Sequence, residues 1–133
     1  MMYIDASNQV LGRLASIVAK NLLKGESVTV VNAEKAVVIG NPEATIEFFK
    51  TKIARGTASF GPFYPKKPDM IFRRVVRAML PFKTARGKEA FKRLKVFISI
   101  PENLREKKFT AVKGVENKGE RKFITMKELA ERV

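Results

Sequence analysis

The sequence predicts an α/β fold in which helices pack against a mainly parallel sheet of about four strands. Short β-branched segments alternate with segments of helical periodicity through the first half of the chain, as they do in βαβ units. Two of these short segments, 27–31 and 35–41, are apolar almost throughout, which is typical of buried parallel strands. With 133 residues, of which 45% are hydrophobic, the chain is long enough to bury a modest core. We therefore expect residues 1–133 to form a single domain.

The first half of the chain carries clear start and stop signals for its helices. Apolar residues between positions 11 and 22 share one helical face, and Gly25 suits the end of that helix. In the next helix Asn41 can act as the N-cap, Pro42 fits the first helical position, and Gly56 lies just past the end. The elements expected here are strands at 2–6, 27–31 and 35–41 and helices at 9–25 and 41–56.

The second half is expected to begin with a loop and to end in a polar arm. Residues 57–67 combine prolines, a glycine and aromatic residues, so they predict a basic, aromatic loop without regular structure. Pro81 prevents the following helix from continuing, and Thr84 and Thr125 are candidate caps, the latter in a Thr-x-x-Glu capping box. The elements expected here are helices at 68–80, 85–94 and 125–133, a strand at 95–100, and a variable C-terminal arm at 101–133 that ends in the short last helix.

The helix predicted at 68–80 has two unlike faces. Its apolar residues, which run from Ile71 to Met79, recur at helical spacing and are expected to face the core. Arg73, Arg74 and Arg77 fall on the opposite side of the same helix. The pattern therefore predicts a core helix whose outer face carries three arginines.

Positive charge is concentrated in the middle of the chain. The formal net charge is +14, from 27 Lys and Arg against 13 Asp and Glu. Between residues 50 and 95 there are 14 basic residues and only two acidic ones, so the rest of the chain is nearly neutral. Such a segregated field favours a polyanionic partner. The alternative is a solvated surface that serves solubility alone, for which a net charge of about 2 to 8 is enough in a small domain.

The sequence argues against catalysis. It contains no histidine and no cysteine, and so it lacks the commonest general base and the commonest strong nucleophile. Neither G-x-G-x-x-G nor G-x-x-x-x-G-K-[ST] occurs, and the carboxylates show no metal-ligand spacing. We expect no enzymatic activity, catalytic residue, metal, cofactor or small-molecule substrate. No apolar run is long enough to span a membrane and no signal peptide is recognisable, so we expect no membrane partner. The absence of cysteine fits an intracellular protein.

Nucleic-acid binding fits the basic middle best, and the spread of charge over a loop, two helices and a proline turn favours folded RNA over a DNA groove. Phe72 lies on the apolar stripe and is expected in the core, whereas the aromatic residues of the loop suit base stacking and local packing equally well. The candidate RNA-binding residues are Arg13, Lys52, Arg55, Phe60, Phe63, Tyr64, Lys66, Lys67, Arg73, Arg74, Arg77, Lys83, Arg86 and Lys88.

Four motifs in this order resemble the universal large-subunit ribosomal protein thirteen family over roughly residues 3 to 98. They are LGRLAS, VVNAEKAVVIGNPEA, RGTASFGPFYPKKPDMIFRRVVRAMLP and KTARGKEAFKRLKVF. The third is the most specific, and its Gly-Pro-Phe-Tyr-Pro segment, with NAEKA in the second motif, resembles the archaeal branch. From Glu102 onward the likeness is weak.

The resemblance implies more than the residues alone indicate. It implies a three-layer α/β/α fold and a non-enzymatic structural constituent of the large subunit in the cytoplasm. It also implies binding to large-subunit ribosomal RNA, support of early subunit assembly, and contact with neighbouring ribosomal proteins. A free-standing RNA-binding module or a messenger-RNA regulator is the alternative that the basic surface would equally support.

Overall fold

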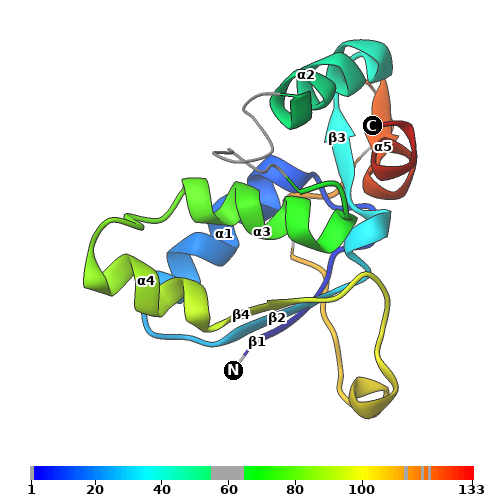
Figure 1. Cartoon of the computed structure of the whole chain (residues 1–133). Helices are drawn as coiled ribbons and strands as arrows, with labels where there is room; N and C mark the ends of the chain where they lie inside the picture. Colours follow the sequence, from blue (N-terminus) through cyan, green and yellow to red (C-terminus); the bar gives the residue numbers. More distant parts are fainter. Residues whose placement is uncertain (1, 55–64, 113, 118, 120) are drawn as a thin grey trace.

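The computed structural model describes residues 2–54, 65–112, 114–117, 119 and 121–133 (Figure 1). Its strands are β1 (Met2–Asp5), β2 (Val28–Val31), β3 (Val37–Ile39), β4 (Leu94–Val96) and β5 (Phe123–Thr125). Its α-helices are α1 (Leu11–Leu23), α2 (Pro42–Ala54), α3 (Pro68–Ala78), α4 (Ala85–Lys92) and α5 (Met126–Arg132). Two short 3-10 helices, η1 (Ala33–Lys35) and η2 (Glu102–Leu104), complete the described elements.

The main sheet is parallel, with the strand order β1-β2-β4. Ile4 lies opposite Val30 in the central strand, and Val30 lies opposite Val96. Figure 1 shows α1, α3 and α4 beside this sheet, and α2 and α5 beside β3 and β5. The α/β class and the mainly parallel sheet are confirmed, and the five helices of the described part are consistent with the three-layer α/β/α fold that the resemblance implied.

The predicted strand at 35–41 exists as β3, but it lies outside the parallel sheet. It pairs with β5 in a separate antiparallel ladder, in which Val38 lies opposite Ile124. The chain leaves the parallel sheet at Asn32, whose backbone is left-handed at φ 57°, and η1 then turns it away. The last strand of the parallel sheet is also shorter than the predicted 95–100, because only Leu94–Val96 keeps strand pairing with β2.

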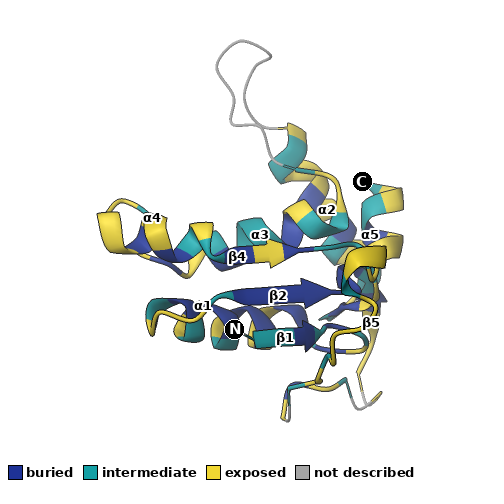
Figure 2. Cartoon of the chain, turned by 90° about the horizontal axis from the view of Figure 1, so that it is seen from below, coloured by how far each residue is buried: buried dark blue, intermediate teal, exposed yellow. Residues whose placement is uncertain are grey.

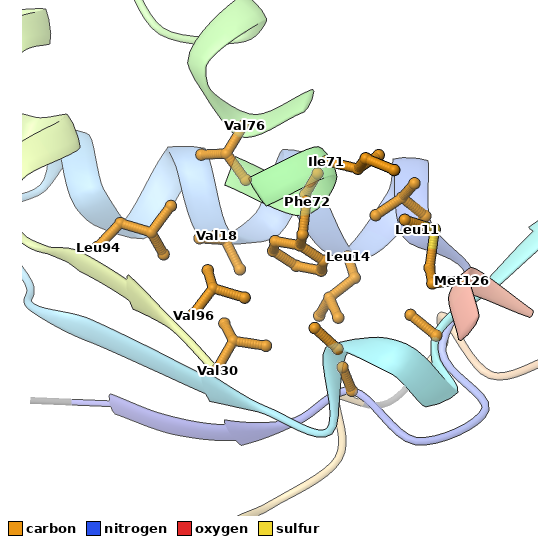
Figure 3. Close-up of a cluster of buried hydrophobic side chains, with 14 of the residues drawn as sticks. Leu11, Leu14, Val18, Val30, Ile71, Phe72, Val76, Leu94, Val96 and Met126 are labelled. Atoms are coloured by element: carbon orange, nitrogen blue, oxygen red, sulfur yellow. The ribbon is translucent and has the colours of Figure 1, made fainter. Parts of the chain in front are cut away.

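One hydrophobic core joins the helices to the parallel sheet. In Figure 3 the side chains of Leu14 and Val18 from α1 and of Phe72 from α3 meet Val30 and Val96 of the strands. Phe72 is fully buried, as the apolar stripe predicted. Figure 2 shows the resulting pattern of burial: β2 is buried along its length, and α4 exposes one side.

The predicted stripe of α3 is wrong at its last position. Met79 lies just beyond the end of the helix, as its C-cap, and is 42% exposed. Leu80 is buried in its place, at 6% exposure. The shift matters for the site described below, because Leu80 anchors the turn that follows α3.

The C-terminal part of the chain contributes directly to the same core. Val115, Ile124, Met126 and Leu129 are all buried in the cluster that includes α1 and α3. The strand β5 was not predicted, because its three residues follow a charged segment and have no alternating pattern of useful length. The last helix begins as predicted, since Thr125 Oγ1 accepts a hydrogen bond of 3.3 Å from the Glu128 N–H.

The carboxyl ends of β1 and β2 are tied together by Asp5. Its carboxylate accepts hydrogen bonds from the Ser7 N–H at 2.9 Å and from the Asn32 side-chain amide at 3.0 Å. Partial burial acts to raise the pKa of the Asp5 carboxyl. The hydrogen bonds from Ser7 and Asn32, together with the charge of Lys35, outweigh burial and hold that pKa below its ordinary value.

An Asp5→Asn variant is expected to lose stability at neutral pH and to lose less of it in acid. Because the folded-state pKa of Asp5 is lowered, its contribution is fully present above the unfolded-state pKa of about 4 and disappears as the pH falls through the folded-state value. Urea unfolding of both proteins from neutral pH down to strongly acidic pH measures this. The gap in unfolding free energy should close toward low pH, and a gap of constant size would contradict the assignment.

Candidate nucleic-acid interface

The three arginines of α3 do not share one environment. Arg73 is half-buried, and its Nη1 donates a hydrogen bond of 2.7 Å to the carbonyl oxygen of Leu94 in β4. Arg74 and Arg77 instead line a hollow at the surface beside the turn after α3. The interpretation of Arg73 as a purely outward-facing residue is therefore wrong. It fastens α3 to the sheet, and the other N–H groups of its guanidinium remain the part that a ligand can reach.

Two aromatic rings hold the arginines of α3 in place. The guanidinium of Arg73 lies over the Phe91 ring at 4.6 Å, and that of Arg77 lies over the Phe82 ring at 4.2 Å. The two rings meet edge to face, with centroids 5.5 Å apart and an interplanar angle of 81°. Stacking on an aromatic face fixes a guanidinium while leaving its N–H edge available. The contacts run in the order Arg73–Phe91–Phe82–Arg77, and they fix the two guanidinium groups in position.

The turn after α3 is rigid and redirects the chain into α4. The Thr84 N–H and hydroxyl both donate to the Pro81 carbonyl oxygen, at 3.0 and 2.8 Å. Thr84 Oγ1 also accepts a hydrogen bond of 3.2 Å from the Gly87 N–H, which confirms Thr84 as the cap of α4. Lys83 is exposed on this turn.

A surface groove of about 510 Å³ lies between the end of α3 and the turn that leads into α4. We call it the α3–α4 groove. Its cationic side chains are those of Arg74, Arg77 and Lys83. Its other lining residues are Ala78, Leu80, Pro81, Phe82 and Thr84, all but one of which are apolar. A smaller hollow of about 220 Å³ lies on the other flank of the α3 arginines, against Met70 and Phe91.

Two basic residues, Arg86 on α4 and Arg93 just after it, donate hydrogen bonds to the backbone of α1. Arg86 Nη2 donates to the Leu23 carbonyl oxygen at 3.3 Å, and Arg93 Nη2 donates to that of Leu22 at 2.6 Å. These carbonyls belong to the last turn of α1, and that of Leu22 also accepts a hydrogen bond of 3.1 Å from the Gly25 N–H. Arg93 was missed as a capping residue, because no sequence pattern links it to a helix 71 residues earlier. Lys88 is exposed on α4.

The other described candidate RNA-binding residues do not line the α3–α4 groove. Lys66 and Lys67 are exposed just before α3, and the ammonium of Lys52 on α2 lies 4.5 Å from the centre of the Phe48 ring. Arg13 on α1 lines a separate polar hollow of about 320 Å³ with Arg121 of the C-terminal segment. The last four candidates fall outside the described residues, namely Arg55, Phe60, Phe63 and Tyr64.

Neither a metal site nor a membrane-spanning helix is found in the described part of the chain. No three His, Cys, Asp or Glu side chains in the described part of the chain are placed to hold a metal ion together. Among the described helices, none has the length and apolar character needed to cross a membrane.

The chain is similar to known ribosomal proteins along most of its length. A family model described as ribosomal protein L13 matches residues 1–103. A protein of Methanopyrus kandleri named large ribosomal subunit protein uL13 is 49% identical over 132 residues, which cover 96% of this chain and 83% of that protein. Proteins of the same name from Picrophilus torridus and Archaeoglobus fulgidus are 45% and 49% identical, over 98% and 82% of this chain and 94% and 70% of their own lengths. The extent of these matches shows that the chain belongs to the ribosomal protein L13 family, on its archaeal branch.

Proposed function

We propose that the chain is a structural constituent of the large ribosomal subunit and binds large-subunit ribosomal RNA through the surface formed by α3, the Pro81 turn and α4. The observation that carries this proposal is the α3–α4 groove, where Arg74, Arg77 and Lys83 converge on one concave surface. Relatives that match almost the whole chain are named as large-subunit proteins. The protein acts by binding and positioning, not by catalysis.

The binding mechanism is electrostatic and depends on a rigid scaffold. Arginine binds phosphate with two parallel hydrogen bonds, and lysine acts as a point charge. The rings of Phe82 and Phe91, which meet edge to face, and the hydrogen-bonded Pro81 turn hold these cationic groups at fixed positions. Fixed cations suit folded RNA, whose phosphates also have fixed positions. Less conformational entropy is then lost on binding than with flexible surface lysines.

The proposed contacts form a central group and an outlying group. Arg74, Arg77, Lys83 and Lys88 are the central contacts, and Arg73 and Arg86 add the donors that their internal hydrogen bonds leave over. The outlying contacts are Arg13, Lys52, Arg55, Lys66 and Lys67, with the loop aromatics Phe60, Phe63 and Tyr64. In this role the chain supports early assembly of the subunit in the cytoplasm and touches neighbouring large-subunit proteins.

Sedimentation separates this function from that of a free-standing RNA-binding module. Large subunits are purified from cells that produce the chain and are washed at about 0.5 M salt, where a protein held by a few exposed phosphate contacts dissociates. We expect the chain to stay in the large-subunit fractions and to be absent from the small-subunit fractions. Its complete release into the top of the gradient would support the free-standing module and refute the ribosomal role.

A further inference from the structure

The α3–α4 groove differs from a simple phosphate-binding surface in its chemistry. Its cations are joined by an apolar wall that includes Leu80, Pro81 and Phe82. A sugar–phosphate backbone that lay across the rim would satisfy the cations, but it would leave this apolar wall facing polar oxygens. A ligand that fits the whole groove must combine a negatively charged part with a flat or apolar part.

The size of the groove limits the kind of ligand that can fill it. A volume of about 510 Å³ lies within the usual range for pockets that take one small molecule, and it is far too small for a helical segment. In RNA, the unit that combines a charge with a flat apolar face is a single nucleotide. Unpaired bases in RNA are commonly recognised by stacking on aromatic rings or on guanidinium planes. Arg77 offers such a plane, because its guanidinium already lies over the Phe82 ring.

We propose that the α3–α4 groove binds one unpaired nucleotide of its RNA, with the base against the guanidinium of Arg77 and the apolar wall and the phosphate at Arg74 and Lys83. This inference rests on the proposed function and specifies the RNA element that it recognises. Hydrogen bonds from Thr84 to the Pro81 carbonyl oxygen fix the wall of the groove. A nucleotide that enters the groove has to leave its helix.

The test compares two RNA duplexes that differ in one nucleotide. One is a short perfectly paired duplex, and the other carries the same sequence with a single unpaired adenosine. Affinity is measured by fluorescence anisotropy with the purified full chain. We expect the RNA with the unpaired adenosine to bind about tenfold more tightly, because stacking of one base is worth about that factor.

The variant Ala78→Leu, which fills part of the groove, tests the contribution of the base to the affinity separately from that of the phosphate. Ala78 is exposed at the end of α3 and lines the groove, so a larger side chain there occupies the space without removing a charge. The variant is expected to lose the tenfold preference, so that its affinity for the RNA with the unpaired adenosine falls to its affinity for the perfect duplex. Its thermal unfolding midpoint serves as the control for folding.

The outcomes distinguish this inference from the proposed function. If the parent chain binds both RNAs equally and Ala78→Leu changes neither affinity, the nucleotide site is refuted, while salt-dependent binding to both RNAs still supports the proposed function. If neither affinity depends on Arg74 and Arg77, the proposed RNA-binding surface is refuted as well.

Discussion

Replacement of Gly87 by alanine is expected to destabilise the protein by about 3 kcal/mol, the upper part of the range for inserting a group into a packed site. A Cβ at this position would overlap the carbonyl carbon and oxygen of Pro81 and would lie 3.0 Å from the Phe82 nitrogen. All three are backbone atoms of the tied turn, so they cannot swing aside as the end of a flexible side chain can. The first turn of α4 would have to move away from Pro81.

The same substitution is expected to weaken RNA binding. Lys83, Phe82 and the wall of the α3–α4 groove belong to the turn that Gly87 approaches. Displacement of this turn separates Lys83 from the α3 arginines and moves Phe82 from under Arg77. Urea unfolding of the free chain measures the loss of stability, and filter binding to large-subunit ribosomal RNA measures the loss of affinity.

Gly12→Ala is the matched control for Gly87→Ala. Gly12 also lies within a helix, but a Cβ built there meets nothing within 4 Å apart from its chain neighbours and the backbone of its own helix. Alanine is favoured over glycine inside a helix by about 0.5 to 1 kcal/mol, so this variant should be as stable as the parent chain or more stable. The two substitutions should therefore have effects of opposite sign. Equal unfolding free energies for the two variants would show that Gly87 is not required for the approach to Pro81.

Local signals in the sequence predicted the helices well, because the groups that end a helix lie next to it in the chain. Asn41 Oδ1 accepts a hydrogen bond from the Glu43 N–H at 2.9 Å, and Thr84 caps α4, both as predicted. The placement of β3 was not predictable in the same way. It depends on the left-handed backbone of Asn32 and on pairing with β5, which lies more than 80 residues further along the chain.

Contacts between distant parts of the chain were also not predictable in the candidate site. Charge density identified the basic segment, but it could not show which of its arginines also hold the fold together. Arg73 bonds to Leu94, and Arg86 and Arg93 bond to the end of α1. All these contacts join residues at least 21 positions apart, so no periodicity reports them. The stacking of Arg77 on Phe82 was not predicted either, because Phe82 lies beyond the end of the helix that carries Arg77.

This distinction makes Arg73 a poor choice for a test of RNA binding. Substitution of Arg73 would remove an internal hydrogen bond, so a loss of affinity would be mixed with a loss of stability. Arg74 and Arg77 both line the α3–α4 groove, and the stacking of Arg77 on Phe82 lies at the surface. The double variant Arg74→Ala/Arg77→Ala therefore removes two cations from the groove and leaves the Arg73 contact intact.

Filter binding of this double variant to large-subunit ribosomal RNA over a range of salt concentrations tests the central claim most directly. Two lost charge-assisted hydrogen bonds of about 1.5 kcal/mol each predict roughly a hundredfold loss of affinity, and the slope of log K against log salt should become shallower by about two. The control is Lys20→Ala/Lys127→Ala, which removes two exposed charges on α1 and α5 that do not line the groove, and should change the affinity little. An Arg74→Ala/Arg77→Ala variant with the affinity and salt slope of the control would contradict the assignment of the α3–α4 surface to RNA.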